Sequence, residues 1–452
     1  MAEIAQERAA KQLRLLEQAI DSGRLGPVKR LVNTLSPAEI GNLLESLPPA
    51  KRQVVWGVVD PEDDGEVLVH VGDEVREDLL RAMDPDEIVA AAETLDIDDL
   101  ADLLDDLPDT VIDELLRSMD RVDRERLEHM LTYGEDTAGR LMNPDVVTVR
   151  ADVTIDVVLR YLRLRGELPD ATDHLYVLSR RRQYQGRISL AQLLTADPAT
   201  PVNRLIDDEQ PAIPADMSSA EVAERFANHD WVSAPVVDGN NVLLGRITID
   251  DVVDIIREQA EHQAMGAAGL DEDADLFAPV PRTTRRRAVW LGINLLTAFL
   301  ASWVIANFEG VLQQVVACAV LMPIVASMGG VAGTQVLTLM VRAMALGQVS
   351  ASNAVLLLRR EVLVALANGV LWAMAVGGIA LVVYRDAWLA LAFGAAMVIN
   401  LIAAALSGVF LPLLLRRVGI DPALAGGVIQ TTVTDCCRIA SFLGLSTLLL
   451  LR

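Results

Sequence analysis

The sequence predicts a multidomain integral membrane protein: an N-terminal α-helical solenoid, two paired α/β modules, a long connecting helix and a membrane domain with five α-helical spans. Three observations predict this fold class: a twelve-residue apolar period, a duplicated strand and helix unit, and five long apolar stretches. A chain of 452 residues has room for about three domains. We expect domain boundaries at 1–132, 133–200, 201–254, 255–280 and 281–452.

The charge is divided unevenly along the chain. From residue 281 onward there are five acids and twelve arginines, a net charge of +7, so the part before residue 281 carries −31 to reach the total of −24. Such an acidic surface repels nucleic acid, which is bound by clustered Lys and Arg, and attracts cations. The region before residue 281 contains no cysteine, which suits a reducing cytosol, and its start lacks the apolar core expected of a signal peptide.

A twelve-residue period predicts the solenoid. Apolar residues recur at this interval from Leu35 to Leu131, with a second apolar series eight residues after the first and turn-forming residues between helices. Twelve residues accommodate a short helix and a tight turn, so stacked small helices are expected. Asp98 and Asp102 lie one helical turn apart on an acidic face, although an acidic run is most often a solvated surface.

A second kind of repeat follows. Residues 175–194 align with residues 234–253 without a gap, so that Gly186 matches Gly245. Each copy reads as strand, turn, strand and helix after an amphipathic helix. Two such copies are expected to pack as a pseudo-symmetric pair with a ligand cleft. Residues 248–277 begin as the last helix of the second copy, and we expect this helix to continue as an acidic rod toward the arginines that precede the first span.

Five stretches are long and apolar enough to cross a bilayer. They cover about 288–307, 311–341, 353–384, 388–415 and 422–451. Arginines lie in the loops on the amino-terminal side, which the positive-inside rule makes cytoplasmic, so the carboxyl terminus is expected outside a cell (inner) membrane. These arginines are Arg285, Arg286, Arg287, Arg342, Arg359, Arg360, Arg416 and Arg417.

The second span contains "MPIVASMGGVAGTQ" at 322–335, which we expect to interrupt it. Gly329 and Gly333 form a small-xxx-small pair, and Thr334 and Gln335 place polar groups at membrane depth. Close helix packing is one interpretation. A break that lines a pore is the other, because irregular backbone in a membrane must face protein or water.

Asp435 is the strongest candidate for an ion site. A carboxylate inside a span costs about 2.5–3.5 kcal/mol on insertion scales, so such residues usually face a cavity or a partner. Thr431 and Thr432 lie on the same helical face, one turn earlier. Oxygen donors alone suit a hard cation, and Mg²⁺ keeps much of its water and needs only one or two carboxylates. Arg438 lies three residues after Asp435 and is a candidate counter-charge.

Taken together, "LMPIVASMGGVAGTQVLTLMVRAMALGQ", "GIDPALAGG", "TTVTD", the helical repeats, "EDTAGRLM" and the duplicated modules resemble the MgtE family of magnesium transporters and channels, whose paired modules are CBS (cystathionine β-synthase) modules. The resemblance implies a homodimer with a Mg²⁺ pore at its axis, Asp435 as the pore acid, and a cytosolic Mg²⁺ sensor with a connecting "plug" helix. The implied sensor ligands are Asp98, Asp102, Asp230, Asp251, Asp254 and Asp421. The pore-lining candidates are Gly329, Gly330, Gly333, Thr334, Gln335, Asn368, Thr431 and Thr432. Thr248 and Asp251 fit the T-x-x-D pattern that holds adenosine ribose, which makes ATP a second candidate ligand.

The chain departs from the family pattern at several positions. Val331 replaces the usual Asn, Arg438 follows the pore acid, and acidic positions read His262, Gln263, Ser218 and Ala220. Mg²⁺ gating is therefore expected to be weaker or tuned differently. The leading hypothesis is a Mg²⁺ channel or transporter gated by divalent ions. The alternatives are a non-conducting sensor in which Arg438 neutralises Asp435, and a conductor with altered selectivity, for example for Co²⁺. No nucleophile and base motif, phosphate-binding loop or zinc spacing suggests an enzyme.

Overall fold

A computed structural model describes residues 16, 18–20, 25–266, 268–270, 275–345, 348–349 and 353–450. The chain separates into two compact units. Residues 1–259 and 273–278 form the soluble unit, and residues 260–272 and 279–452 form the membrane unit. Each unit is described by itself. The ends of the first and last predicted elements, at residues 1–15 and 451–452, fall outside the described residues.

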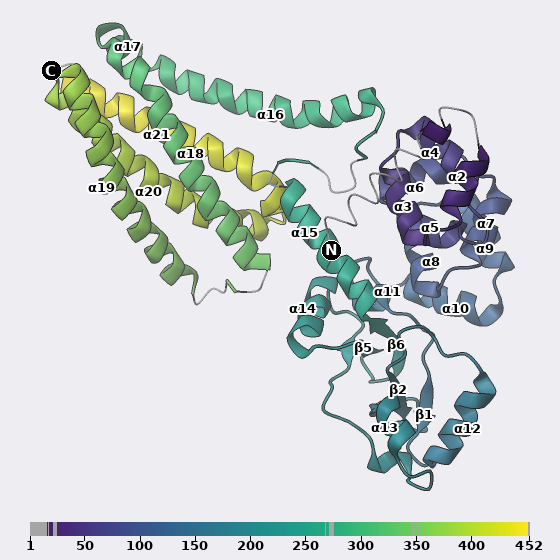
Figure 1. The fold of residues 1–452 in the computed structure, drawn as a ribbon. Coiled ribbons are helices and arrows are strands. Elements are labelled where there is room, and N and C mark those ends of the chain that lie inside the picture. Colours follow the sequence, from purple (N-terminus) through teal and green to yellow (C-terminus); the bar gives the residue numbers. More distant parts are fainter. Residues whose placement is uncertain are drawn as a thin grey trace. The chain divides into compact units, whose positions relative to one another are not determined.

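Short helices fill the first part of the soluble unit and confirm the predicted solenoid (Figure 1). Most begin twelve residues apart, often at a Pro or after a capping side chain; Ser36, for example, caps its helix in a capping box with Glu39. Apolar residues of both series, such as Leu47 of the first and Leu79 and Leu103 of the second, form the continuous core. The helices are α2 (Leu25–Val32), α3 (Pro37–Glu45), α4 (Pro49–Trp56), α5 (Asp64–Val69), α6 (Asp73–Leu80), α7 (Pro85–Ala92), α8 (Ile97–Leu104), α9 (Asp109–Ser118) and α10 (Arg121–Met130).

Two three-stranded sheets with the same topology follow, as the gapless alignment of the two copies predicts. In each sheet the central strand is parallel to the first strand and antiparallel to the third. The first sheet contains β1 (Thr148–Arg150), β2 (His174–Leu178) and β3 (Tyr184–Ser189), with α12 (Ile155–Arg165) and α13 (Leu190–Thr195). The second contains β4 (Ile213–Pro214), β5 (Ser233–Val237) and β6 (Leu243–Thr248), with α14 (Ser219–His229). A 3₁₀ turn, η1 (Val202–Arg204), lies between them.

The segment that we assigned to the start of the first α/β module packs on the second sheet instead. The segment contains the short helix α11 (Ala138–Leu141), in which the amide of Ala138 donates to the carbonyl of Met217. Just after this helix, Asn143 exchanges backbone hydrogen bonds with Arg246. A module boundary at 132/133 is therefore not a packing boundary. This exchange was invisible in the sequence because the apolar pattern does not reveal which sheet a short helix covers.

The connecting helix is shorter than predicted. Helix α15 (Ile249–Gly266) ends at Gly266, so the predicted helical rod through residue 277 is wrong. Gly266 lies close to Ala423, and Gly269 adopts a left-handed backbone with φ of 67°, which glycine tolerates without steric cost. Glycine at these two positions thus helps to end the helix before the acidic run that we expected to be helical.

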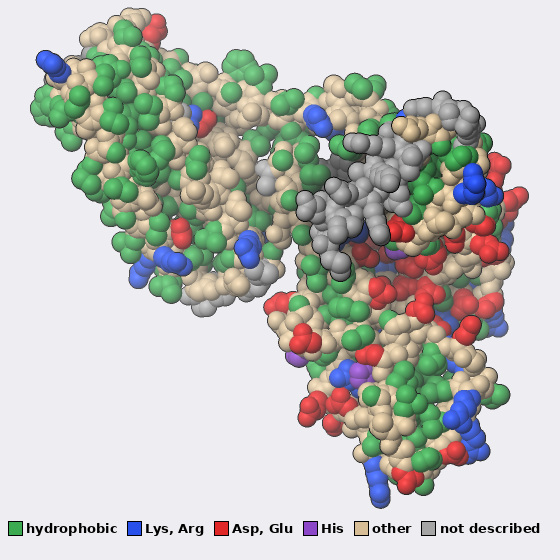
Figure 2. Space-filling model, in the orientation of Figure 1, with side chains coloured by type: hydrophobic (Ala, Val, Ile, Leu, Met, Phe, Trp, Pro, Cys, Tyr) green, Lys and Arg blue, Asp and Glu red, His purple; other side chains and the backbone are tan. Residues whose placement is uncertain are grey.

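Long apolar helices make up the membrane unit, and five of those described are long enough to cross a bilayer by length and composition. They are α16 (Val280–Ala306), α18 (Val316–Ala345), α19 (Ala354–Tyr384), α20 (Ala387–Val418) and α21 (Pro422–Leu450), with the short α17 (Glu309–Gln314) before α18. Hydrophobic side chains cover the visible face of these helices, whereas Asp and Glu gather over the solenoid (Figure 2). Helix α18 runs unbroken through "MPIVASMGGVAGTQ", so the predicted interruption of this span is wrong.

Glycines and buried amides fix the spacing of α18, α20 and α21. A Cβ at Gly329 would overlap the side-chain amide of Asn400, and one at Gly333 would overlap that of Gln430. Asn400 donates to the carbonyl of Val325 at 3.0 Å, and Gln430 donates to the hydroxyl of Ser407 at 2.9 Å. Hydrogen bonds between membrane helices contribute on average about 0.6 kcal/mol each. Their main effect here is to fix the helix register.

Candidate ion site and acidic clusters

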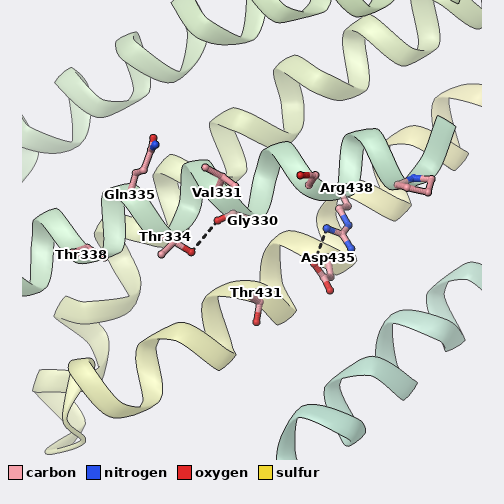
Figure 3. A pocket seen from close by; sticks show the side chains of 10 residues that line it. Gly330, Val331, Thr334, Gln335, Thr338, Thr431, Asp435 and Arg438 are labelled. Carbon is pink, nitrogen blue, oxygen red and sulfur yellow. Dashed lines mark hydrogen bonds and ion pairs between the residues drawn. The ribbon is translucent and has the colours of Figure 1, made fainter. Parts of the chain in front are cut away.

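A pocket of about 910 Å³ lies between α18 and α21 (Figure 3). Its α18 wall is one helical face with residues spaced mostly by three or four. The α21 wall repeats this spacing with Thr431, Asp435 and Arg438. The α18 residues are Pro323, Ser327, Gly330, Val331, Thr334, Gln335 and Thr338. The pocket therefore combines one carboxylate and one guanidinium with hydroxyl and amide groups.

Asp435 and Arg438 form an ion pair inside this pocket. Nη1 of Arg438 lies 2.9 Å from Oδ1 of Asp435, and the side chains of Arg438 and Asp435 are 17% and 32% exposed. Figure 3 shows the guanidinium turned back toward the carboxylate, one helical turn away. In half-buried surroundings such a pair is screened less than on an open surface. The carboxylate that the sequence marks as an ion ligand therefore already has a cation beside it.

The other pore-lining candidates divide into two groups. Gly330, Thr334, Gln335 and Thr431 line the pocket together with Asp435. Gly329 and Gly333 face Asn400 and Gln430, and therefore make helix contacts instead of lining this pocket. Thr432 donates its hydroxyl to the carbonyl of Val428, and Asn368 is an exposed residue of α19. The sequence reasoning missed the lining residues Pro323, Ser327 and Thr338. Helical spacing could have predicted them, because they lie on the same face of α18 as Gly330 and Thr334.

In the soluble unit, carboxylates of α8 and α15 crowd together. Burial raises the pKa of Asp98 to about 8, and the nearby Asp251, Asp99 and Asp96 contribute to this shift. Burial and Asp251 likewise raise the pKa of Asp99 to about 7, and burial raises the pKa of Asp251 to about 6. Asn143 donates to Asp96 at 3.0 Å and to Asp98 at 3.2 Å. Crowded like charges of this kind hold protons or attract a cation.

Three other predicted sensor residues have different neighbours. Oδ1 of Asp102 lies 3.8 Å from Nε of the buried Arg140, although burial still raises the pKa of Asp102. Asp254 faces Arg257 at 3.7 Å, with both side chains more than half exposed. Asp230 ends α14 in a left-handed conformation, with φ of 52°. Within the described parts of the chain, no three His, Cys, Asp or Glu side chains are arranged to hold a metal ion.

Asp421 is bound to the connecting helix at the entry to α21. Nε2 of His262 contacts Oδ2 of Asp421, and the other carboxylate oxygen accepts from the amide of Ala423 at 2.8 Å. His262 thus makes a direct contact at a position where the family pattern has an acid. Ser218 caps α14 by accepting from the amide of Glu221, so it serves helix capping.

Thr248 and Asp251 bond to each other. The amide and hydroxyl of Thr248 both donate to Oδ2 of Asp251, at 3.1 and 3.0 Å. This arrangement caps the start of α15 and orients the carboxylate. Because the charge of Asp251 also acts on Asp98, the acids of the solenoid and the T-x-x-D pair belong to the same acidic cluster.

The sequence reasoning missed several residues that complete these clusters. Asp96 and Asp99 flank Asp98, and Asn143 and Arg140 reach the α8 acids from the segment around α11. The run "DIDDLADLLDD" contained the first two, but the reach of Asn143 and Arg140 depends on the packing of α11 and carried no local signal.

A membrane unit with a carboxylate-bearing pocket, joined to an acidic soluble unit, defines a cation transport protein. Comparisons with known families agree. Residues 322–445 match the MgtE model, described as a divalent cation transporter, residues 35–136 match the MgtE intracellular N domain, and residues 138–199 and 202–258 match the CBS domain. The chain belongs to the MgtE family of magnesium transporters, and it is therefore a multi-pass membrane protein and not an enzyme.

Full-length relatives carry the same family name. A magnesium transporter MgtE of Thermus thermophilus is 30% identical over 442 residues, covering 96% of this chain and 98% of the relative. A magnesium transporter MgtE of Bacillus subtilis is 27% identical over 427 residues, 94% of each chain.

Solved structures are also similar to part of this chain. The crystal structure of the cytosolic domain of the Mg²⁺ channel MgtE in complex with ATP is 30% identical, with a TM-score of 0.49. The match covers 53% of this chain and 98% of that chain.

Proposed function

We propose that the chain forms a homodimer in a cell membrane and conducts Mg²⁺ past Asp435. The observation that carries this proposal is the pocket between α18 and α21, whose lining holds one carboxylate, paired with Arg438, together with hydroxyl and amide side chains. Such donors suit a cation that keeps most of its water and uses one carboxylate per site. The full-length relatives named as magnesium transporters support the choice of ion.

A flux measurement tests this function. The full-length protein is reconstituted in liposomes that contain a Mg²⁺ indicator dye. We expect Mg²⁺ influx in the parent protein and none in Asp435→Ala, since this substitution removes the carboxylate and leaves Arg438 to repel the ion. Asp386→Asn is the matched control, because Asp386 caps α20 outside the pocket. Undiminished flux in Asp435→Ala would overturn the assignment of the site.

We propose in addition that divalent ions regulate the pore through the acidic soluble unit. The crowded carboxylates of Asp98, Asp99 and Asp251 support this proposal, since a bound Mg²⁺ would replace the protons that their raised pKa values favour. Fewer carboxylates remain to bind Mg²⁺ in this chain. Asp421 is already bound by His262, and the family's acidic positions are occupied by Ser218 and Ala220. We therefore expect weaker gating by Mg²⁺ than an all-acidic set would give.

ATP is a second proposed ligand of the soluble unit. The oriented carboxylate of Asp251 suits the hydroxyls of a ribose, which would donate to it. The neighbouring acids disfavour a free triphosphate, so we expect binding only with Mg²⁺ present. Isothermal titration of the full-length protein with ATP, with and without Mg²⁺, checks this; Asp251→Ala should abolish the heat of binding.

The ion pair between Arg438 and Asp435 favours a second candidate function, a non-conducting sensor with a neutralised pore acid. Arg438→Gly discriminates the two. Flux that appears only in this variant would support the sensor, whereas flux in the parent rules it out. Competition with Co²⁺ in the same liposomes tests whether the ion pair has changed the selectivity.

A further inference from the structure

Arg52 of α4 is a buried arginine whose charge is balanced from a distant part of the chain. Its side chain is 1% exposed, and it donates to the carbonyls of Leu44 and Leu47 at 3.0 and 3.2 Å. Its Nη2 also donates to Oδ2 of Asp275 at 2.9 Å, and the side chain of Asp275 is equally buried. Asp275 lies between α15 and α16, 223 residues along the chain.

A second contact holds the same segment. The amide of Asp275 donates to Oε2 of Glu74 in α6 at 2.9 Å, and Glu74 is only 4% exposed. The segment then turns on itself, because the amide of Phe277 donates to Oδ1 of Asp275 at 2.9 Å. Residues 273–278 accordingly belong to the soluble unit, although the chain on both sides belongs to the membrane unit.

This arrangement is specific because both partners are buried. A buried ion that loses its partner is strongly unfavourable, so Arg52 needs an acid at this place once it has left water. The ion pair with Arg52 requires an acid in the segment. The hydrogen bond from the amide of Asp275 to Glu74 also requires the backbone of the segment to lie at one position. A solvent-exposed linker would need neither contact.

We propose that residues 275–278 are a docking segment of the solenoid, and that this docking couples the solenoid to the first turn of α16. Helix α16 begins at Val280, two residues after the segment, and the amides of Arg282 and Thr283 already bond to the carbonyl of Pro279. A solenoid that holds Asp275 therefore fixes the chain at the point where the first span begins. When Asp275 is released from Arg52, the start of α16 is no longer held by the solenoid.

Hydrogen exchange measured by mass spectrometry on the full-length protein in detergent micelles tests this proposal without any assumption about conduction. The variant is Asp275→Asn, which keeps the volume and the turn but removes the charge. The matched control is Asp123→Asn, an acid of the same domain paired with Arg126 at 3.1 Å on the surface. We expect exchange in residues 275–278 and in the first turn of α16 to accelerate about tenfold or more in Asp275→Asn, and to stay unchanged in the control.

Two results would overturn the proposal. Unprotected exchange of residues 275–278 in the parent would mean that the segment does not dock. Faster exchange in 275–278 with no change in α16 would mean that docking is not coupled to the first span. Arg52→Gln is a weaker probe, since it also withdraws two hydrogen bonds inside the solenoid and can unfold it.

Discussion

Asp98 and Asp435 are carboxylates in half-buried surroundings, but their neighbours carry opposite charges. Burial raises the pKa of Asp98, and repulsion by Asp251, Asp99 and Asp96 contributes. Asp435 has the guanidinium of Arg438 at 2.9 Å. The acids around Asp98 therefore repel one another, whereas Asp435 already has a cation beside it. We therefore expect a divalent ion to stabilise the acidic cluster directly, and to compete with Arg438 for Asp435 in the pocket.

The pocket around Asp435 forms only if α18 and α21 keep their close spacing. Gly333→Leu should abolish Mg²⁺ flux and cost about 1–3 kcal/mol of stability, because its side chain would displace Gln430 and separate α18 from α21. Flux in liposomes and the thermal midpoint of the purified protein check this. Gly378→Leu is the control, since a Cβ at Gly378 meets nothing within 4 Å. Equal loss in both variants would contradict the proposed spacing role.

The crowded acids around Asp98 should make the stability of the protein depend on pH. A raised pKa means that the folded protein holds the proton of Asp98 more tightly than the unfolded chain does. Stability is therefore lost as the pH rises from about 4 toward about 8. Asp98→Asn should raise the thermal midpoint at pH 8 in a chelator by about 2–4 °C for each kcal/mol of repulsion removed.

The same variant separates charge from packing. The difference between the parent and Asp98→Asn should be smallest near pH 4, where Asp98 is protonated in the folded protein, and should grow as the pH rises to 8. Added Mg²⁺ at pH 8 should stabilise the parent more than the variant. A pH-independent difference between the two proteins would refute the electrostatic origin.

The smallest effect is expected at Asp254. This side chain is 55% exposed and its distance to Arg257 is 3.7 Å, and exposed pairs contribute about 0–1 kcal/mol. Asp254→Asn should leave the thermal midpoint in chelator nearly unchanged. If Mg²⁺ stabilises this variant less than the parent, Asp254 is a ligand of the divalent site. If Mg²⁺ stabilises both proteins equally, Asp254 is not a ligand.

Periodic features could be predicted from the sequence, and contacts between distant elements could not. The twelve-residue period and the gapless alignment of the two copies predicted the solenoid and the two sheets, because local spacing determines which face is buried. The end of α15 at Gly266 was missed, since we extended the helix along the acidic run up to residue 277 and did not treat Gly266 and Gly269 as stop signals. The contacts of Gly329 and Gly333 with buried amides depend on helices far apart in the sequence.

The candidate site was predicted only in part for the same reason. Helical spacing placed Thr431 beside Asp435 and raised the question of Arg438, but a spacing of three residues does not determine a side-chain rotamer. The ion pair at 2.9 Å came from the structure alone. The linking of Asp275 to Arg52 also had no sequence signal, because two charges 223 residues apart share no local pattern.

We propose that Mg²⁺ competes with Arg438 for Asp435. The most direct test measures Mg²⁺ influx at rising Mg²⁺ concentration in liposomes that contain the parent protein or Arg438→Gln. We expect both proteins to conduct, and we expect Arg438→Gln to reach half-maximal flux at a Mg²⁺ concentration about tenfold lower, the equivalent of about 1.4 kcal/mol. Identical saturation curves, or a parent that never conducts, would contradict it.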